Sequence, residues 1–179
     1  MEAEHRNRLL ALLEKIPHGV PAGWEKETFA VGGLTYLGFS AAQTEKLVVI
    51  STQEQSVIDC RTWEMTCCAE NYDEDDLIAC AEPLGDELIP IAGEWRGGLR
   101  RFSPAGERLD RAAPFWPREQ IIFMPRYTIW QQRPEACTVI FDDYEPQTFG
   151  FSRCGNYMAV GTSSEVDIFR RIGESSYEL

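Results

Sequence analysis

Histidine is scarce in this sequence, and both copies lie near the N-terminus. His5 falls in a segment with helical spacing, and His18 falls in a turn rich in proline and glycine. A serine–histidine–acid triad or a cysteine–histidine pair would therefore depend on one of these peripheral residues. The nucleophile motif Gly-x-Ser-x-Gly is also missing. These absences argue against the common hydrolytic mechanisms that use histidine.

Long apolar runs and an excess of basic residues are missing as well. No run approaches the roughly 20 apolar residues that span a bilayer, and charges interrupt the first fifteen positions, so we expect neither a membrane span nor a secretory signal. This pattern predicts a cytoplasmic protein. The formal net charge of −12 opposes contact with nucleic acid or anionic lipid, because phosphates would meet a repulsive mean field. We expect a neutral or basic protein partner, with solubility as the alternative role of the acidic charge.

The cysteines lack the spacing of a metal site. No two of the six form a Cys-x-x-Cys pair, which is typical of zinc knuckles. Cysteine is often buried as a small apolar residue, and a reducing compartment keeps thiols free. We therefore expect free, buried thiols, no structural metal and no bound cofactor. The six residues are Cys60, Cys67, Cys68, Cys80, Cys137 and Cys154.

The hydrophobic pattern predicts one domain over residues 1–179, with a helix at the start and β-structure after it. Apolar residues recur every three or four positions through residue 16, where Pro17 stops the pattern, so residues 1–16 form the expected helix. Short segments rich in β-branched and aromatic residues then alternate with turn residues over 34–171. The expected fold is mainly β, with antiparallel blade-like hairpins packed as a sandwich or as curled sheets.

Twelve strands are expected in this β body. They cover residues 34–40, 46–51, 56–60, 63–68, 87–92, 98–102, 120–124, 127–130, 137–141, 148–152, 156–160 and 166–170. A short helix is expected over 77–81, because the carboxylates before it favour a helix N-terminus. A hairpin turn is expected over 142–146, which contains Asp142 and Asp143.

Two segments of the chain are similar to each other. Gly38-Phe39-Ser40 and Gly150-Phe151-Ser152 each precede an apolar strand, a turn and a second strand. The segment FGFSRCGNYMAVGTSSEVDIFRR, residues 149–171, resembles part of a blade of the WD-repeat β-propeller family. This resemblance implies antiparallel hairpins that serve as an interaction scaffold. A closed propeller needs about four blades of about 40 residues each, and the Gly-His and Trp-Asp pairs are absent, so we expect open sheets.

Two polar segments are candidate binding sites. The run of consecutive acidic residues at 73–76 lacks the alternating ligands and the central glycine of an EF-hand calcium loop, so a solvated loop is favoured over a cation site. A glycine-rich segment over 93–101 combines an aromatic residue with arginines, which suits an anion or carboxylate. Its glycines do not lead into a helix, and pairing with nearby acids is the alternative. The residues concerned are Asp73, Glu74, Asp75 and Asp76 in the run, and Trp95, Arg96, Arg100 and Arg101 in the segment.

Several large aromatic residues are candidates for a contact surface. Aromatic residues dominate binding hot spots, although packing in the core is the alternative. Phe115 and Trp116 lie between two prolines, which disrupt regular strand pairing, so we expect them to be the least buried. The other candidates of this kind are Trp95, Tyr127 and Trp130.

These features favour a non-catalytic protein-binding module. An inhibitor or immunity-type protein that neutralises a basic enzyme fits the description. The alternative is a small-molecule-binding protein or a carboxylate-dependent hydrolase, marked by a deep pocket joining Arg96, Arg100 or Arg101 to Asp142 or Asp143. A domain with a purely structural role is the third possibility, and a large apolar patch would mark it.

Overall fold

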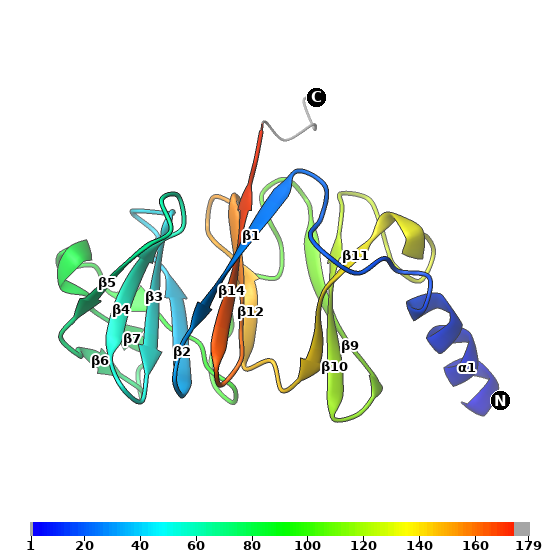
Figure 1. Ribbon diagram of the computed structural model, residues 1–179, viewed down its shortest axis with the longest axis horizontal. Coiled ribbons are helices and arrows are strands. Elements are labelled where there is room, and N and C mark those ends of the chain that lie inside the picture. The colour runs from blue at the N-terminus through cyan, green and yellow to red at the C-terminus, as the bar shows by residue number, and fades with distance from the viewer. Residues whose placement is uncertain (1, 174–179) are drawn as a thin grey trace.

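In the computed structural model, which describes residues 2–173, four antiparallel sheets stand in a row with a helix at one end (Figure 1). The expected mainly β fold with a short N-terminal helix is confirmed. The elements are α1 (Glu2–Leu13), β1 (Trp24–Ala30), β2 (Leu34–Phe39), β3 (Lys46–Ser51), β4 (Gln55–Asp59), β5 (Glu64–Cys68), β6 (Tyr72–Asp73), β7 (Ile78–Ala79), η1 (Glu82–Leu84), β8 (Ile89–Pro90), β9 (Arg108–Phe115), β10 (Arg118–Met124), η2 (Pro134–Ala136), β11 (Thr138–Tyr144), β12 (Thr148–Phe151), β13 (Tyr157–Gly161) and β14 (Glu165–Arg171).

Each sheet is built mostly from strands that follow one another in the chain. The four strand orders are β6-β7-β8, β2-β3-β4-β5, β1-β14-β13-β12 and β11-β10-β9. The third sheet is the exception, because β1 crosses to pair antiparallel with β14, with Trp24 opposite Arg171 and Ala30 opposite Glu165. The two ends of the β-structure are therefore joined in one central sheet.

The sheets pack face to face, and each interface has its own apolar cluster. In β3, Leu47 and Val49 face the central sheet, whereas Val48 and Ile50 face the β6-β7-β8 sheet. Successive side chains of a strand point to opposite faces, so a strand buried on both faces needs an uninterrupted apolar run. This packing explains why the interior strands have continuous apolar sequences.

Helix α1 covers the outer face of the β11-β10-β9 sheet. Leu13 and Ile16 pack there against Ile122 and Met124. The helix ends at Leu13, before the expected residue 16, because the N–H groups of Lys15 and Ile16 bond to carbonyls three residues back. Such bonds tighten the last turn beyond α-geometry. Residue 1 of the expected helix and residues 174–179 of the expected domain lie outside the described residues.

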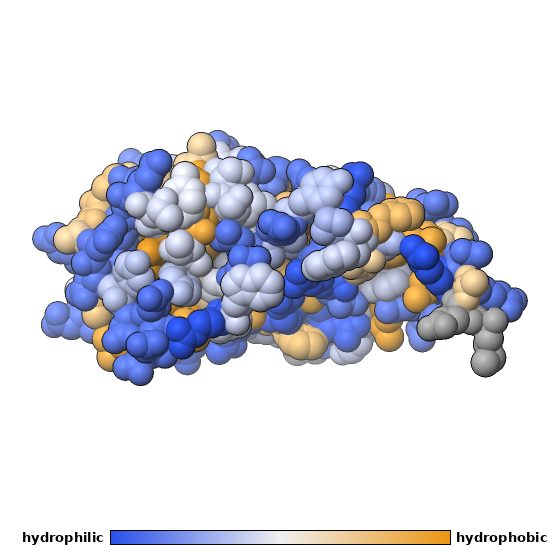
Figure 2. Space-filling model, turned by 90° about the horizontal axis from the view of Figure 1, so that it is seen from below, coloured by the Kyte–Doolittle hydropathy of each residue, from blue (hydrophilic) through white to orange (hydrophobic). Residues whose placement is uncertain are grey.

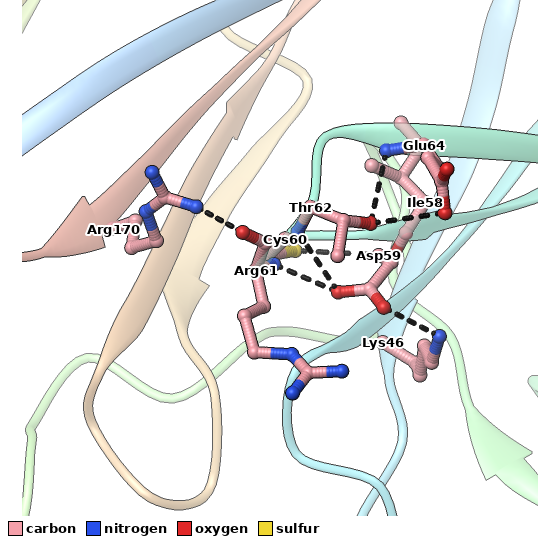
Figure 3. Close-up of polar contacts among 8 residues, drawn as sticks. All are labelled: Lys46, Ile58, Asp59, Cys60, Arg61, Thr62, Glu64 and Arg170. Atoms are coloured by element: carbon pink, nitrogen blue, oxygen red, sulfur yellow. Dashed lines mark hydrogen bonds and ion pairs between the residues drawn. The ribbon is translucent and has the colours of Figure 1, made fainter.

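Arg170 of β14 joins the central sheet to the turn between β4 and β5. Its guanidinium lies 4.4 Å from the ring centre of Trp63. The same guanidinium donates a hydrogen bond to the carbonyl of Arg61 (Figure 3). Its Nε lies 2.5 Å from Glu25 Oε1 on β1. A planar guanidinium can stack and donate at once, so one side chain connects three segments.

Arg171, the next residue, points to the other side and joins the central sheet to the β11-β10-β9 sheet. Its two Nη atoms lie 3.0 Å and 2.6 Å from the two carboxylate oxygens of Glu107. The Glu107 carboxylate also accepts a hydrogen bond of 2.8 Å from the Ser103 hydroxyl. The Glu107 side chain is only 2% exposed, so this is a buried, two-pronged ion pair.

Asp59 organises the turn that Arg170 contacts (Figure 3). Its Oδ1 accepts the N–H groups of Arg61 and Thr62 at 2.8 Å and 3.3 Å, and its Oδ2 lies 2.8 Å from Lys46 Nζ. Burial alone would raise the pKa of this carboxyl, but the hydrogen bonds from Lys46 and the backbone outweigh it and lower the pKa. Asp59 is therefore held as a carboxylate.

Two expected strands are wrong. Residues 98–102 form only isolated bridges, with Arg100 opposite Phe151 and Phe102 opposite Arg108. Residues 127–130 form turns, because Tyr127 adopts a φ of 59° and the N–H of Thr128 bonds to the carbonyl of Pro125. A residue in the left-handed backbone conformation cannot continue an extended strand. Aromatic composition was misleading at both places.

The expected helix over 77–81 and the expected turn over 142–146 are also wrong. Leu77 has a φ of 54°, which breaks a right-handed helix, and β7 follows it. β11 extends through Asp142 and Asp143 to Tyr144, and the chain reverses only at Glu145, whose φ is 52°. In both places one residue in the left-handed backbone conformation decides the local structure.

Candidate functional site

A pocket of about 320 Å³ opens where β2 and β12 begin, along the lower edge of the row of sheets in Figure 1. We call it the rim pocket, and we call this edge of the row the rim. Its lining comes from four separate parts of the chain. The lining residues are Leu34, Thr35, Tyr36, Tyr72, Glu74, Glu94, Trp95, Arg96 and Gln147.

The rim pocket brings together two candidate segments that are distant in sequence. Arg96 Nη1 lies 3.6 Å from Asp75 Oδ1, and Arg96 Nη2 donates a hydrogen bond of 3.4 Å to the Asp75 carbonyl. Asp73 Oδ1 accepts the N–H groups of Asp75 and Asp76, which makes the acidic run a tight turn. The Asp75 side chain is 94% exposed, so its pair with Arg96 is open to water.

Gly93 allows the Trp95–Arg96 segment to approach β2 closely. A Cβ at this position would lie 2.5 Å from the Thr35 carbonyl oxygen and 3.0 Å from the Tyr36 ring. The Gly93 N–H donates to the Arg96 carbonyl at 2.9 Å, closing a loop around Trp95. Trp95 is consequently 87% exposed on a loop that is anchored at its base.

Aromatic rings and carboxylates share the wall of the rim pocket. The Tyr36 and Tyr72 rings lie 6.0 Å apart, and the Tyr36 hydroxyl donates a hydrogen bond of 3.2 Å to Glu74 Oε2. Burial, this hydrogen bond and the charge of Glu74 raise the pKa of Tyr36, and the charge of Arg96 opposes them. The phenol therefore stays protonated at neutral pH and keeps Glu74 in place.

The hairpin turn at Phe115 and Trp116 extends the aromatic surface along the rim. These side chains are 62% and 74% exposed, so the connection is poorly buried. The expectation that they are the least buried candidates is wrong, because Trp95 and Tyr127 are 87% and 84% exposed. Arg118 lies opposite both Phe115 and Tyr144 in the sheet, and Tyr144 precedes the pocket residue Gln147 by three positions. The rim pocket and this hairpin, together the rim surface, lie at the same end of neighbouring sheets.

Figure 2 views the molecule from below, onto the lower edge of the row in Figure 1. Side chains of intermediate hydropathy lie among hydrophilic ones on this face, and hydrophobic residues form only small, separate patches (Figure 2). A large apolar patch, which would mark a domain with a purely structural role, is not present on this face.

The remaining aromatic candidates lie elsewhere. Tyr127 is 84% exposed, but it follows Met124 at the other end of β10 from Arg118. Trp130 is buried against α1, and its indole N–H donates a hydrogen bond of 2.9 Å to Asp110. The aromatic candidates therefore do not form one surface.

Arg100 and Arg101 do not reach the acidic run. The Arg100 carbonyl accepts the N–H of Phe151 at 2.7 Å, which ties this part of the segment to β12. The Arg101 guanidinium lies 3.3 Å from the ring centre of Phe149, and its pKa is lowered, mainly by burial. The arginines of segment 93–101 thus have separate surroundings, with only Arg96 at the rim pocket.

Asp142 and Asp143 also lie apart from these arginines. Asp142 accepts hydrogen bonds from Arg118 Nε at 2.8 Å and Gln120 Nε2 at 3.2 Å, and lies 3.6 Å from His18. The Asp143 carboxylate accepts the backbone N–H of Tyr144. The described residues therefore do not form the pocket of arginine and paired aspartates that a carboxylate-dependent hydrolase would use.

The cysteines are free thiols with different exposure. Burial was expected for all six but holds only for Cys60 and Cys137, because Cys67 is exposed and the other three are partly exposed. Burial, together with neighbouring negative charge, raises the pKa of Cys137 to about 11. Within residues 2–173, no three histidine, cysteine or acidic residues converge as metal ligands.

No helix in the described part of the chain has the length and apolar character to cross a membrane. The family models, the curated proteins and the solved structures with which the chain was compared gave no match. The geometry of the rim surface is therefore the basis for assigning a function.

Proposed function

We propose that this protein is a non-catalytic protein-binding module and that the rim surface is its contact face. The supporting observation is the convergence of the acidic run and the exposed Trp95 on one pocket, with Tyr36 and Tyr72 beside them. Aromatic side chains that cluster beside a pocket are typical anchors of protein interfaces. The Phe115–Trp116 turn supplies further exposed aromatic area along the same edge of the row of sheets.

The charge of the chain favours a basic partner. The net charge is −12, and the acidic run beside the pocket adds local negative potential. Complementary charge speeds association and rejects partners of like charge. An inhibitor or immunity-type protein acting on a basic enzyme combines these properties.

Small-molecule binding is the second candidate function. The volume of the rim pocket, about 320 Å³, falls at the lower end of the range for ligand pockets, about 300–1,000 Å³. Native mass spectrometry of protein purified from its own cells tests this candidate. A bound compound that Trp95→Ala releases would support it, and protein of unmodified mass would argue against it.

Photo-cross-linking tests the protein-binding proposal. A benzoylphenylalanine at position 95 should capture a partner of net positive charge in the cells that make the protein. Position 127 is the matched control, because Tyr127 is about as exposed as Trp95 but lies just beyond Met124, at the end of β10 that points away from the rim. Capture of the same proteins from both positions, or of none from position 95, would contradict the proposal.

A further inference from the structure

We infer that the rim pocket receives one basic side chain, an arginine or a lysine of the partner, and that Arg96 competes with it. The inference rests on the proposed protein-binding function and names the group that would be recognised. Three features of the pocket support it: its aromatic faces, the net negative charge of its lining and the weak ion pair that holds Arg96.

The aromatic faces suit a cation. Tyr36, Tyr72 and Trp95 line the same pocket, and the two tyrosine rings lie 6.0 Å apart at an interplanar angle of 50°. A guanidinium or ammonium within about 6 Å of such a ring is attracted by its negative face. The exposure of Trp95 leaves its indole available to a partner.

The ionised side chains of the lining carry a net negative charge. Glu74 and Glu94 provide two carboxylates against the single cation of Arg96. A basic side chain supplies several hydrogen-bond donors to such carboxylates. An anionic ligand would instead meet this negative lining.

Arg96 already places a guanidinium at the edge of the pocket. Its closest carboxylate is Asp75 at 3.6 Å, and their side chains are 48% and 94% exposed. A pair in water contributes little, about 0–1 kcal/mol, so a guest of the same chemistry can displace Arg96 from the acidic turn. Removal of Arg96 should therefore strengthen binding of a basic guest.

A titration with short peptides tests the inference. The probe is acetyl-Gly-Arg-Gly-amide, and its neutral isostere with citrulline in place of arginine is the control. The five tryptophans give five indole N–H signals in a ¹⁵N-labelled sample, and Trp95→Phe identifies the one from Trp95. We expect the arginine peptide to shift the Trp95 signal while the Trp130 signal, from a buried indole, stays in place. Equal shifts with the citrulline peptide, or no shift of Trp95 with either, would overturn the inference.

Variants of the lining residues give directional results with the same probe. Tyr72→Ala should weaken binding by about two- to fivefold, the range of one exposed cation–π contact. Glu74→Gln should weaken it by up to about fivefold, the range of one exposed ion pair. Arg96→Ala should tighten binding, and Tyr127→Ala should leave it unchanged. Weaker binding by Arg96→Ala would show that Arg96 itself contacts the guest, which contradicts the competition.

The two proposals can fail separately. A failed titration together with a partner captured from position 95 overturns only the basic-side-chain inference, because the partner then uses other chemistry. A failed capture overturns the protein-binding proposal, whatever the peptide does.

Discussion

Two arginine–carboxylate pairs in this protein have the same chemistry and opposite surroundings. Arg171 and Glu107 form two hydrogen bonds between neighbouring sheets, where their side chains are 11% and 2% exposed. Arg96 and Asp75 meet at 3.6 Å on the rim, where both are largely exposed. Water screens the second pair and leaves its members free to exchange partners, whereas the first pair is fixed by burial. The comparison separates groups that hold the sheets together from groups that are available for binding.

The largest effect should follow removal of one buried partner. Glu107→Gln leaves the Arg171 guanidinium buried without its carboxylate, which costs about 3–5 kcal/mol of unfolding free energy. Urea denaturation measures this loss. Arg96→Ala is the matched control on the rim. Similar losses in the two variants would mean that burial does not distinguish the pairs.

Asp59 should have an intermediate effect, because it is buried and bonded to both Lys46 and the backbone. Asp59→Ala should lower the unfolding free energy by about 1–3 kcal/mol at pH 7, since two backbone N–H groups lose their acceptor. Asp59→Asn removes the charge but retains an acceptor oxygen, so its loss should be smaller.

The effect of Asp59 should also depend on pH. The pKa of Asp59 is lowered in the folded state, so its ionic contribution is present above the ordinary aspartate value of 3.8 and is lost as the pH falls through the folded pKa. The difference in stability between wild type and Asp59→Asn should therefore shrink between pH 7 and roughly pH 2. A stability difference that is constant with pH would show that the charge of Asp59 does not contribute to the free energy of unfolding.

Arg170 should have a smaller effect than either buried group. Its stacking on Trp63 and its pair with Glu25 are partly exposed. Arg170→Ala should cost about 1 kcal/mol of unfolding free energy. Arg170→Lys keeps the charge and loses the planar stacking, so a loss as large as that of alanine would show that stacking is the main contribution.

The smallest effect on stability should come from Arg96. Arg96→Ala should change the unfolding free energy by no more than about 0.5 kcal/mol, as is usual for an exposed substitution. A loss above about 1 kcal/mol would show that Arg96 holds the acidic turn in place, and the proposed competition would then need a different residue.

The interior of this fold could be read from the sequence because buried strands have distinctive runs. The strand expected at 46–51 has the bounds of β3, and Phe39 and Phe151 occupy matching positions at the ends of β2 and β12, opposite Leu47 and Met158. Both faces of β3 and β13 are buried, so alternation is replaced by an apolar run.

Two edge strands with largely exposed side chains, β1 and β9, could not be read in the same way. β1 has the sequence WEKETFA, and its side chains are mostly exposed after Trp24. Its partner β14 follows more than a hundred residues later, so no local pattern signals the pairing. β9 alternates between exposed and partly buried residues, and its first residue lies beside a glycine turn. Such strands form because a neighbouring strand offers hydrogen bonds.

The candidate site was predictable in its parts but not in its assembly. Trp95, Arg96 and the acidic run were recognisable by residue type, whereas Tyr36, Tyr72, Glu94 and Gln147 were missed. Tyr72 adjoins the acidic run and Glu94 adjoins Trp95, so sequence proximity was an available signal for these two. Tyr36 and Gln147 join the pocket only through the packing of three sheets, which the sequence does not display.

The affinity of the captured partner for matched rim and control variants tests the central claim most directly. We predict that Trp95→Ala weakens binding by about 30-fold or more, which corresponds to about 2 kcal/mol and marks an interface anchor. Tyr127→Ala removes a similarly exposed ring beyond the end of β10 that points away from the rim. It should change the dissociation constant by less than about twofold. An unchanged dissociation constant for Trp95→Ala, or an equal loss for Tyr127→Ala, would contradict the assignment of the rim surface as the contact face.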